Sequence, residues 1–311
     1  MSANIAVVIP TKNRLTSLLR ALESVRTQTL LPIEVIVVDD GSTLPLTPSI
    51  FATFPSSVNC YLCRNETSLG ASASRNIGIQ RASASYIAFL DDDDEFLNHK
   101  IEKIEKIIAT HAPDLVFHSI HYHYVNEGVS RTVYREEGEI KDAFNKLLKG
   151  NIIGSTSAVV LKKSTLEDVG GGFLESLATQ EDYDLWLRFA LKRKKIVACS
   201  EALTQYNCQT QSQSLSKDQR GNTKDKAIVF QFYKCYVTSE IGKAQRFSNL
   251  KESWHRALVN YNKGSLRNYA RLCLKEKVSI ETFMLWLVSF MSPKQIIQCI
   301  CLLKRKVHHK K

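Results

Sequence analysis

The sequence predicts an α/β fold with a helical C-terminal extension, and three observations lead to this class. Short apolar runs rich in β-branched residues alternate with segments of helical periodicity in the first part of the chain. Polar and acidic residues follow several of these runs directly, and beyond about residue 227 the pattern is helical throughout. With 311 residues, of which 44% are hydrophobic and 23% charged, the chain can bury a large core.

Four apolar runs are predicted to form parallel strands, with helices between them. The runs occupy residues 5–9, 34–38, 58–64 and 86–90. Residues 15–25 repeat apolar positions at helical spacing, and residues 68–82 read as a turn followed by a helix. In such sheets, ligands bind beyond the carboxyl ends of the strands. The polar residues after Ile9, Val38 and Leu90 therefore mark the candidate functional edge.

The later elements are less regular. We expect helices over residues 97–108, 144–148 and 182–191, and strands over residues 114–124 and 157–161. Gly170, Gly171 and Gly172 form a loop between them. These glycines do not follow a strand in the spacing that binds dinucleotides, so they do not predict such a site.

The positive charge is concentrated at the C-terminal end. The chain carries a net charge of +11. Lys243 to Lys311 contains 15 Lys or Arg and three Glu, a net charge of +12, which leaves −1 for the first 242 residues. An anionic partner is therefore expected at this end. Aromatic residues do not interleave with the basic ones across the predicted sheet, which argues against nucleic acid.

An apolar stretch in the basic segment is too short to cross a membrane. Phe283–Met291 has nine residues before Pro293 interrupts the pattern, whereas a span needs roughly 20. We predict an interfacial helix at an anionic membrane surface, with a helical cap on the core as the alternative. Residues 1–4 lack a basic region and a cleavage site, so we expect no signal peptide and a cytoplasmic chain.

Cysteine and histidine patterns do not predict a zinc site. Cys60 and Cys63 form a lone pair at C-x2-C spacing, typical of buried thiols in a reducing cytosol. His118, His121 and His123 lie in one strand-like run, and the last two share a face. No acidic residue nearby completes a ligand set, so we expect no metal there.

Four aspartates at the end of the fourth run are the strongest local signal. Asp91 and Asp93 project to the same side of an extended chain. Two carboxylates about 5 Å apart repel by about 3 kcal/mol at an effective dielectric near 20, so a cation is favoured between them. Carboxylate oxygens suit Mg²⁺ or Mn²⁺. The alternative is an acidic loop in solvent.

Three other segments carry candidate residues. Asp39 and Asp40 follow the second strand, where a carboxylate can accept hydrogen bonds from a nucleobase or only shape a turn. Arg75 lies on a predicted helix and can meet a diphosphate, although such an arginine is commonly a surface residue. Glu181 and Asp182 precede a helix, where acids are stabilising in any case, but one can act as a general base.

Six segments, in order and spacing, together resemble the family 2 glycosyltransferases, a large inverting group with the GT-A fold. Each segment is weak alone, but all six in register are highly specific, and they cover roughly residues 5–216. The segments are VVIPTKNR (7–14), SVRTQT (24–29), EVIVVDDGST (34–43), LGASASRNIGI (69–79), YIAFLDDDDEF (86–96) and GGFLESLATQEDYDLWLR (171–188).

The resemblance implies a role for each matching residue. Asp93 would be the main ligand of Mg²⁺ or Mn²⁺, together with Asp91. Asp182 would be the catalytic base, with Glu181 a weaker candidate. Gly171, Gly172 and Trp186 would line the acceptor side. The nucleotide-sugar would be bound by Pro10, Thr11, Asn13, Arg14, Asp39, Asp40, Arg75, Asp91 and Asp92, with Asp40 accepting from the base.

The resemblance also implies a domain plan and an activity. A GT-A-like mixed sheet flanked by helices would occupy residues 1–225, with a nucleotide-sugar-binding half (1–110) and an acceptor half (111–225). A basic helical segment (226–311) would follow. The activity would be transfer from a UDP-linked donor to a hydroxyl of a glycan or lipid-linked acceptor. Such an enzyme would serve polysaccharide or lipopolysaccharide biosynthesis at the cytoplasmic face of the inner membrane.

One departure from the family keeps alternatives open. Many relatives carry Tyr-x-x-His before a Ser-rich loop, whereas this chain has Gln209 in place of the histidine, so no third protein ligand is assigned. An inactive transferase is one alternative. A sugar-phosphate nucleotidyltransferase is another, although Pro10 to Arg14 lacks the glycines of its loop. The third is a non-catalytic basic protein that binds membrane or nucleic acid.

Overall fold

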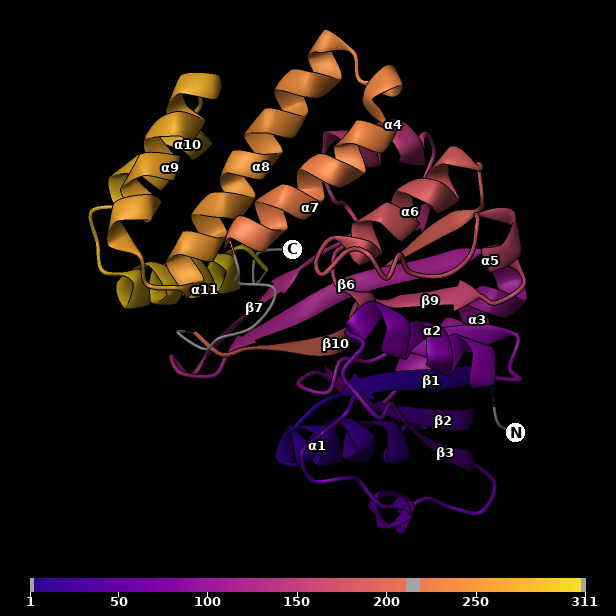
Figure 1. Cartoon of the computed structure of the whole chain (residues 1–311). Helices are drawn as coiled ribbons and strands as arrows, with labels where there is room; N and C mark the ends of the chain where they lie inside the picture. Colours follow the sequence, from indigo (N-terminus) through magenta and orange to yellow (C-terminus); the bar gives the residue numbers. More distant parts are fainter. Residues whose placement is uncertain (1–2, 211–218, 309–311) are drawn as a thin grey trace. The chain divides into compact units, whose positions relative to one another are not determined.

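The computed structural model describes residues 3–210 and 219–308 (Figure 1). The chain divides into two compact units. The first comprises residues 1–121, 132–144 and 153–206, and the second residues 122–131, 145–152 and 207–311. Besides the C-terminal helices, the second unit contains three segments of the expected acceptor half, residues 122–131, 145–152 and 207–225.

A mixed sheet runs through the first unit, as the sequence predicts. Its main strands are β1 (Ala3–Thr11), β2 (Pro32–Asp39), β3 (Asn59–Arg64), β4 (Tyr86–Phe89), β5 (Glu95–Phe96), β6 (Leu115–Tyr124), β9 (Val159–Lys162) and β10 (Ile196–Cys208). Their order is β3-β2-β1-β4-β9-β6-β10-β5, with β7 (Val129–Val133) beside β6 and β8 (Gly138–Glu139) beside β10. The strands β3, β2, β1 and β4 are parallel, whereas β9 is antiparallel to β4 and β6.

The helices confirm most of the predicted periodicity. They are α1 (Leu15–Arg26), α2 (Ala71–Arg81), α3 (Lys100–His111), α4 (Ala143–Lys149), α5 (Thr165–Asp168) and α6 (Glu181–Leu191), with 3₁₀ turns η1 (Pro48–Phe51) and η2 (Thr156–Ala158). In α1, Leu18, Leu22 and Val25 are buried in the core. Leu15 and Leu19 are 49% and 46% exposed, so only part of the predicted apolar stripe packs inward.

Helix α2 approaches β1 closely because a glycine faces the strand. A Cβ atom at Gly78 would lie 2.3 Å from Cγ1 of Val8, which is fully buried. No side chain therefore fits at this position without a shift of the helix. Arg75 precedes Gly78 by three residues and shares its helix face. The close packing thus sets how near Arg75 comes to the end of the sheet.

Two features of the first unit differ from the sequence prediction. Strand β10 was not predicted, because Ser200, Glu201 and Gln205 break both a continuous apolar run and a clear alternation. Helix α3 begins at Lys100 instead of residue 97, because Glu95 and Phe96 form β5 and pair with β10. Hydrogen bonding to a distant strand thus decides a boundary that local periodicity leaves undefined.

The second unit is helical, as predicted for the chain beyond residue 227. Its helices are α7 (Gln219–Phe232), α8 (Ser239–Val259), α9 (Lys263–Glu276), α10 (Ile280–Val288) and α11 (Pro293–His308), with a 3₁₀ turn η4 (Lys234–Tyr236). Side chains of Thr238, Asn262 and Ser279 cap α8, α9 and α10. Among the described residues, none of the helices has the length and apolar character that a membrane crossing requires.

Candidate active site

The loops that follow β1 and β2 are tied to each other. The backbone N–H of Asn13 donates to Oγ of Ser42 over 2.8 Å, and Oδ1 of Asn13 accepts from the N–H of Thr43 over 2.8 Å. Asn13 has a φ of 55°, a left-handed conformation that asparagine tolerates better than most residues. Pro10 precedes this loop within β1 and is buried. The first motif (residues 7–14) is therefore held in one conformation by the third (residues 34–43).

The carboxylates of Asp39 and Asp40, in the third motif, both accept hydrogen bonds from other residues of the chain. Asp39 accepts from the N–H of Ser42 and forms an ion pair with Arg64. Asp40 accepts four hydrogen bonds, from the side chains of Asn65 and Ser68 and from the N–H groups of residues 69 and 70. Burial disfavours its charged form, but these donors outweigh burial and hold the pKa of Asp40 below its usual value.

The saturation of Asp40 bears on its expected role. A carboxylate offers about four acceptor positions, and donors from the loop before α2 fill them. A nucleobase could reach Asp40 only by displacing one of these donors. In this structure, Asp40 orders the loop that leads into α2.

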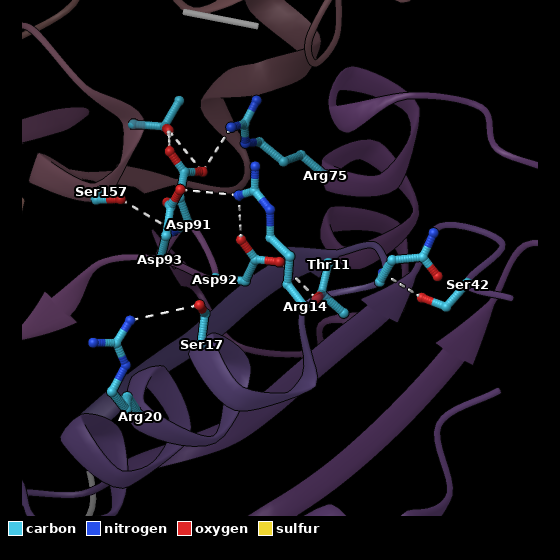
Figure 2. A network of polar contacts seen from close by, with 12 residues as sticks. Thr11, Arg14, Ser17, Arg20, Ser42, Arg75, Asp91, Asp92, Asp93 and Ser157 are labelled. Atoms are coloured by element: carbon cyan, nitrogen blue, oxygen red, sulfur yellow. Dashed lines mark hydrogen bonds and ion pairs between the residues drawn. The ribbon is translucent and has the colours of Figure 1, made fainter. Parts of the chain in front are cut away.

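The aspartates after β4 converge with two arginines (Figure 2). Nη1 of Arg14 lies 3.0 Å from Oδ1 of Asp92 and 2.9 Å from Oδ2 of Asp93. Nη2 of Arg75 lies 2.7 Å from Oδ1 of Asp91. The predicted residues of the first, fourth and fifth motifs therefore come together, as the sheet-edge argument expects.

Arg75 also connects this acidic strand end to helix α6. Its Nη1 lies 2.8 Å from Oε1 of Glu181, and the Arg75 side chain is only 6% exposed. Its guanidinium also lies 5.4 Å from the ring centroid of Phe173. One buried arginine thus bridges two acids that are 90 residues apart in the sequence.

Asp182 is adjacent to this bridge at the start of α6. Its Oδ1 accepts from the N–H of Tyr183 over 2.6 Å. Burial, followed by repulsion from Glu181, raises the pKa of Asp182 to about 7, while Arg75 acts in the opposite direction. A carboxyl group that titrates near neutral pH has the proton affinity that a general base needs.

The residues around Asp93 fit a divalent cation. Burial, followed by repulsion from Asp91 and Asp92, raises the pKa of Asp93 to about 6 despite the Arg14 contact. The cluster is therefore incompletely neutralised by its arginines. Among the described residues, no three His, Cys, Asp or Glu side chains are grouped so that they could hold a metal. Mg²⁺, however, is commonly bound by one or two carboxylates together with substrate phosphates, which matches Asp93 and Asp91.

Sequence reasoning missed three residues that hold the acidic cluster in place, Thr156, Ser157 and Lys100. Ser157 Oγ accepts from the N–H of Asp91 over 3.0 Å, and Thr156 Oγ1 lies 3.2 Å from its Oδ2. The fully buried Lys100 donates from Nζ to the carbonyl oxygen of Ser157 over 2.7 Å and to Oγ1 of Thr204 over 3.1 Å. A signal was available, because Lys100 shares the apolar face of α3 with residues 104 and 107.

The expected acceptor residues have two different environments. Trp186 was expected to line the acceptor side, but its side chain is fully buried and packs edge-on against Phe173, with ring centroids 6.4 Å apart. It belongs to the core because α6 turns this apolar face inward. The Gly171–Gly172 loop is instead held by Arg188, which donates to both of its carbonyl oxygens.

The histidines and Gln209 have the following environments in the structure. His118 is fully buried, with Nδ1 2.7 Å from the carbonyl oxygen of Ser119, and burial lowers its pKa far below the usual value. His121 and His123 contact hydroxyl groups of β7 residues. Gln209 is exposed just after β10, and the Ser-rich loop over residues 211–214 lies outside the described residues.

A cavity of about 650 Å³ lies beside the first motif (residues 7–14) and the end of the third (residues 34–43). Thr11, Asn13 and Arg14 belong to its lining, together with leucines of α1 and residues 42–47 of the loop after β2. The leucines Leu15, Leu19 and Leu44 give it a largely apolar wall, which the sequence did not predict.

Sequence comparison places these motifs among known proteins. Residues 6–170 match the family described as glycosyl transferase family 2. Over 299 residues, the chain is 28% identical to an uncharacterized glycosyltransferase of Haemophilus influenzae, covering 94% of this chain and 97% of that protein. It is 29% identical over 215 residues to the Escherichia coli enzyme WfaP, named UDP-Glc:alpha-D-GlcNAc-diphosphoundecaprenol beta-1,3-glucosyltransferase, covering 68% of this chain and 80% of WfaP.

A solved structure with the same fold supports the assignment. S. aureus TarS 1-349 in complex with UDP-GlcNAc matches with a TM-score of 0.58 at 19% identity, covering 93% of this chain and 79% of that one. The GT-A-like fold that the motifs imply is therefore confirmed.

Proposed function

Because the chain belongs to glycosyl transferase family 2, we propose that it moves a sugar from a UDP-linked donor to a hydroxyl group of a lipid-linked glycan, with inversion at the anomeric carbon. The observation that carries the proposal is the buried bridge Asp91–Arg75–Glu181, which connects the acidic strand end to Glu181, the residue that precedes Asp182 in helix α6. Membership of this family argues against the two rival interpretations, a sugar-phosphate nucleotidyltransferase and a non-catalytic binding protein.

The donor would bind at the carboxyl ends of β1, β2 and β4. The loop of Pro10, Thr11 and Asn13 and the loop after Asp39 form one fixed wall, and Asp40 keeps the approach to α2 in place. Arg14 and Arg75 are the cations within reach of the acidic cluster and would meet the diphosphate. UDP is favoured because the names of WfaP and of the TarS complex include UDP-linked sugars.

A divalent cation would be held by Asp93 and Asp91, with Asp92 beside them. When bound, Mg²⁺ or Mn²⁺ neutralises charge on the diphosphate leaving group. The protein residues perform the remaining tasks. Arg75 orients the acidic strand end toward α6, and the hydroxyl of Thr11 fixes Asp92 through a 2.7 Å hydrogen bond.

Asp182 would act as the general base. It takes the proton of the acceptor hydroxyl as the oxygen attacks the anomeric carbon from the face opposite the diphosphate, and the bond between sugar and diphosphate breaks. UDP leaves, and the new glycosidic bond has inverted configuration. Proton removal contributes about 10²- to 10⁴-fold to the rate. Glu181 is bound to Arg75 and serves better as a positioning residue than as the base.

The acceptor would be a lipid-linked precursor of a cell-surface polysaccharide or lipopolysaccharide. WfaP carries diphosphoundecaprenol in the name of its acceptor, which supports this class. The enzyme would then work at the cytoplasmic face of the inner membrane. Comparing transfer to a sugar diphosphate lipid with transfer to the same sugar without the lipid tests this part of the proposal.

Titration calorimetry with UDP tests the donor site. We expect wild-type protein to bind UDP more tightly with Mn²⁺ than without it, and Asp93→Ala to lose the difference. Asp168→Ala is the matched control, because Asp168 is 62% exposed and pairs with Lys194 on the surface. If UDP does not bind under either condition, the UDP assignment is wrong. If it binds equally well without metal and to Asp93→Ala, the metal assignment is wrong.

A further inference from the structure

Helix α10 and the residues on either side of it expose a large apolar surface. We name it the apolar patch, and its members are Val278, Ile280, Phe283, Met284, Leu287 and Phe290. Their side chains are 85%, 85%, 48%, 48%, 43% and 56% exposed, respectively. Six large apolar side chains exposed within 13 residues differ from the scattered single residues of an ordinary protein surface.

The orientation of α10 accounts for this exposure. Thr282 and Ser289 are fully buried, and each satisfies its hydroxyl through a backbone carbonyl, Lys277 O at 2.7 Å and Trp286 O at 2.6 Å. Two small polar residues therefore face the rest of the unit, Leu285, Trp286 and Val288 are half-buried, and Phe283, Met284 and Leu287 are exposed. The exposed face of this helix is thus apolar, unlike that of a helix that only covers a core.

A row of cations on α9 borders the apolar patch. Lys263, Arg267, Arg271 and Lys275, here called the basic stripe, recur every four residues and are exposed. None of them forms an ion pair with any residue that the structure describes. Arg267 lies over the ring of Phe290, 5.2 Å from its centroid, so the stripe and the patch are continuous. Figure 1 shows α9 and α10 side by side.

We infer that the apolar patch and the basic stripe form a docking surface for an anionic lipid bilayer. Aromatic and aliphatic side chains that enter the interface, bordered by unpaired cations, are the features of a helix that lies on a membrane. The charge of the basic stripe distinguishes between two partners that could cover this surface, a second copy of the chain and an anionic membrane. A second copy of this chain would bring two rows of unpaired cations together, whereas anionic headgroups would neutralise them. The inference does not depend on the chemistry proposed for the acidic cluster.

Vesicle flotation of the full-length protein tests the inference. The probes are vesicles of phosphatidylcholine alone and of phosphatidylcholine mixed equally with phosphatidylglycerol, at low and high salt. We expect binding to the anionic vesicles that weakens with salt. Phe283→Ser/Leu287→Ser should reduce partitioning at least about 10-fold, and Arg267→Glu/Arg271→Glu should reduce it by a similar factor on anionic vesicles only.

A matched pair of exposed residues provides the control. Ile228 and Phe232 are 37% and 59% exposed and have the same spacing on α7. Ile228→Ser/Phe232→Ser should bind like wild type, and circular dichroism melts should confirm that all variants fold. Undiminished binding of the α10 variant would overturn the inference and assign membrane binding to the basic residues 304–311. No binding to either vesicle would also overturn it. So would a dimer in light scattering that only the α10 variant dissociates.

Discussion

Replacing Arg75 by methionine should destabilise the first unit strongly. The guanidinium is almost completely buried and contacts Asp91 and Glu181 at 2.7 and 2.8 Å, where these carboxylates are 27% and 13% exposed. Breaking a buried ion pair from one side costs about 3–5 kcal/mol, because the remaining charges lose their partner. For a unit of this size, that corresponds to a fall in Tm of about 6–20 °C. Urea unfolding at pH 8 measures the free energy directly.

The loss should depend on pH. Arg75 lowers the pKa of Asp182, so its removal raises that pKa above about 7. A carboxyl group whose folded pKa is raised contributes stability that is present at low pH and is lost as pH rises through the folded value. The difference between variant and wild type should therefore be larger at pH 8 than at pH 5.

Two comparisons make this prediction refutable. Arg26→Met removes a partly exposed arginine that pairs with Glu23 in the same helix, and it should leave the free energy of unfolding almost unchanged. Arg75→Met/Glu181→Gln should recover part of the loss, because one unpaired charge is removed. If Arg75→Met unfolds within 1 kcal/mol of wild type at pH 8, the bridge has no structural role.

Three further outcomes follow from the site. Asp182→Asn should lower kcat by about 10²- to 10⁴-fold with little change in UDP affinity, and the wild-type rate should fall below pH 7 as Asp182 takes up its proton. Equal pH profiles in variant and wild type would refute Asp182 as the base. Gly172→Ala should destabilise the protein by about 1–3 kcal/mol in thermal melts, because the added Cβ would lie 2.3 Å from Oδ1 of Asn76. Lys100→Met should cost about 1–3 kcal/mol in urea unfolding, since the carbonyl oxygen of Ser157 and the hydroxyl of Thr204 each lose a hydrogen bond. A change below 0.5 kcal/mol would contradict this role.

The sequence predicts those parts of the fold whose local pattern is unambiguous. The run at residues 5–9 is apolar throughout and the run at residues 34–38 is apolar after Glu34, so a buried parallel strand fits both, and both are buried. Strand β10 could not be predicted, because its mixture of Ser, Glu and Gln is explained by pairing with β5 and β8. Periodicity describes a segment alone, whereas this strand is defined by its neighbours.

In the candidate site, too, local sequence patterns predict some features, whereas contacts between distant segments are not predicted. The positions of Asp91–Asp93 follow from their motif and from where strands end. The bridge from Arg75 to Glu181 spans 106 residues, and no local pattern indicates it. Trp186 lies in a motif next to a candidate catalytic acid, and its helix face, which the motif does not reveal, makes it fully buried. Motifs identified which residues matter, but packing decided which of them touch.

The contact between Gly78 and Val8 has a consequence for how variation in this chain should be interpreted. Helix α2 places Arg75 at the end of the sheet only because Gly78, one turn later, has no side chain that would meet Val8. Even an alanine there would lift the helix from the strand and move the guanidinium away from both of its acids. A substitution that touches no ligand, alters no charge and lies in the apolar interior would therefore resemble a catalytic defect in an activity screen. The tolerance of this enzyme to mutation should be narrow along the inner face of α2 and wider on its outer face.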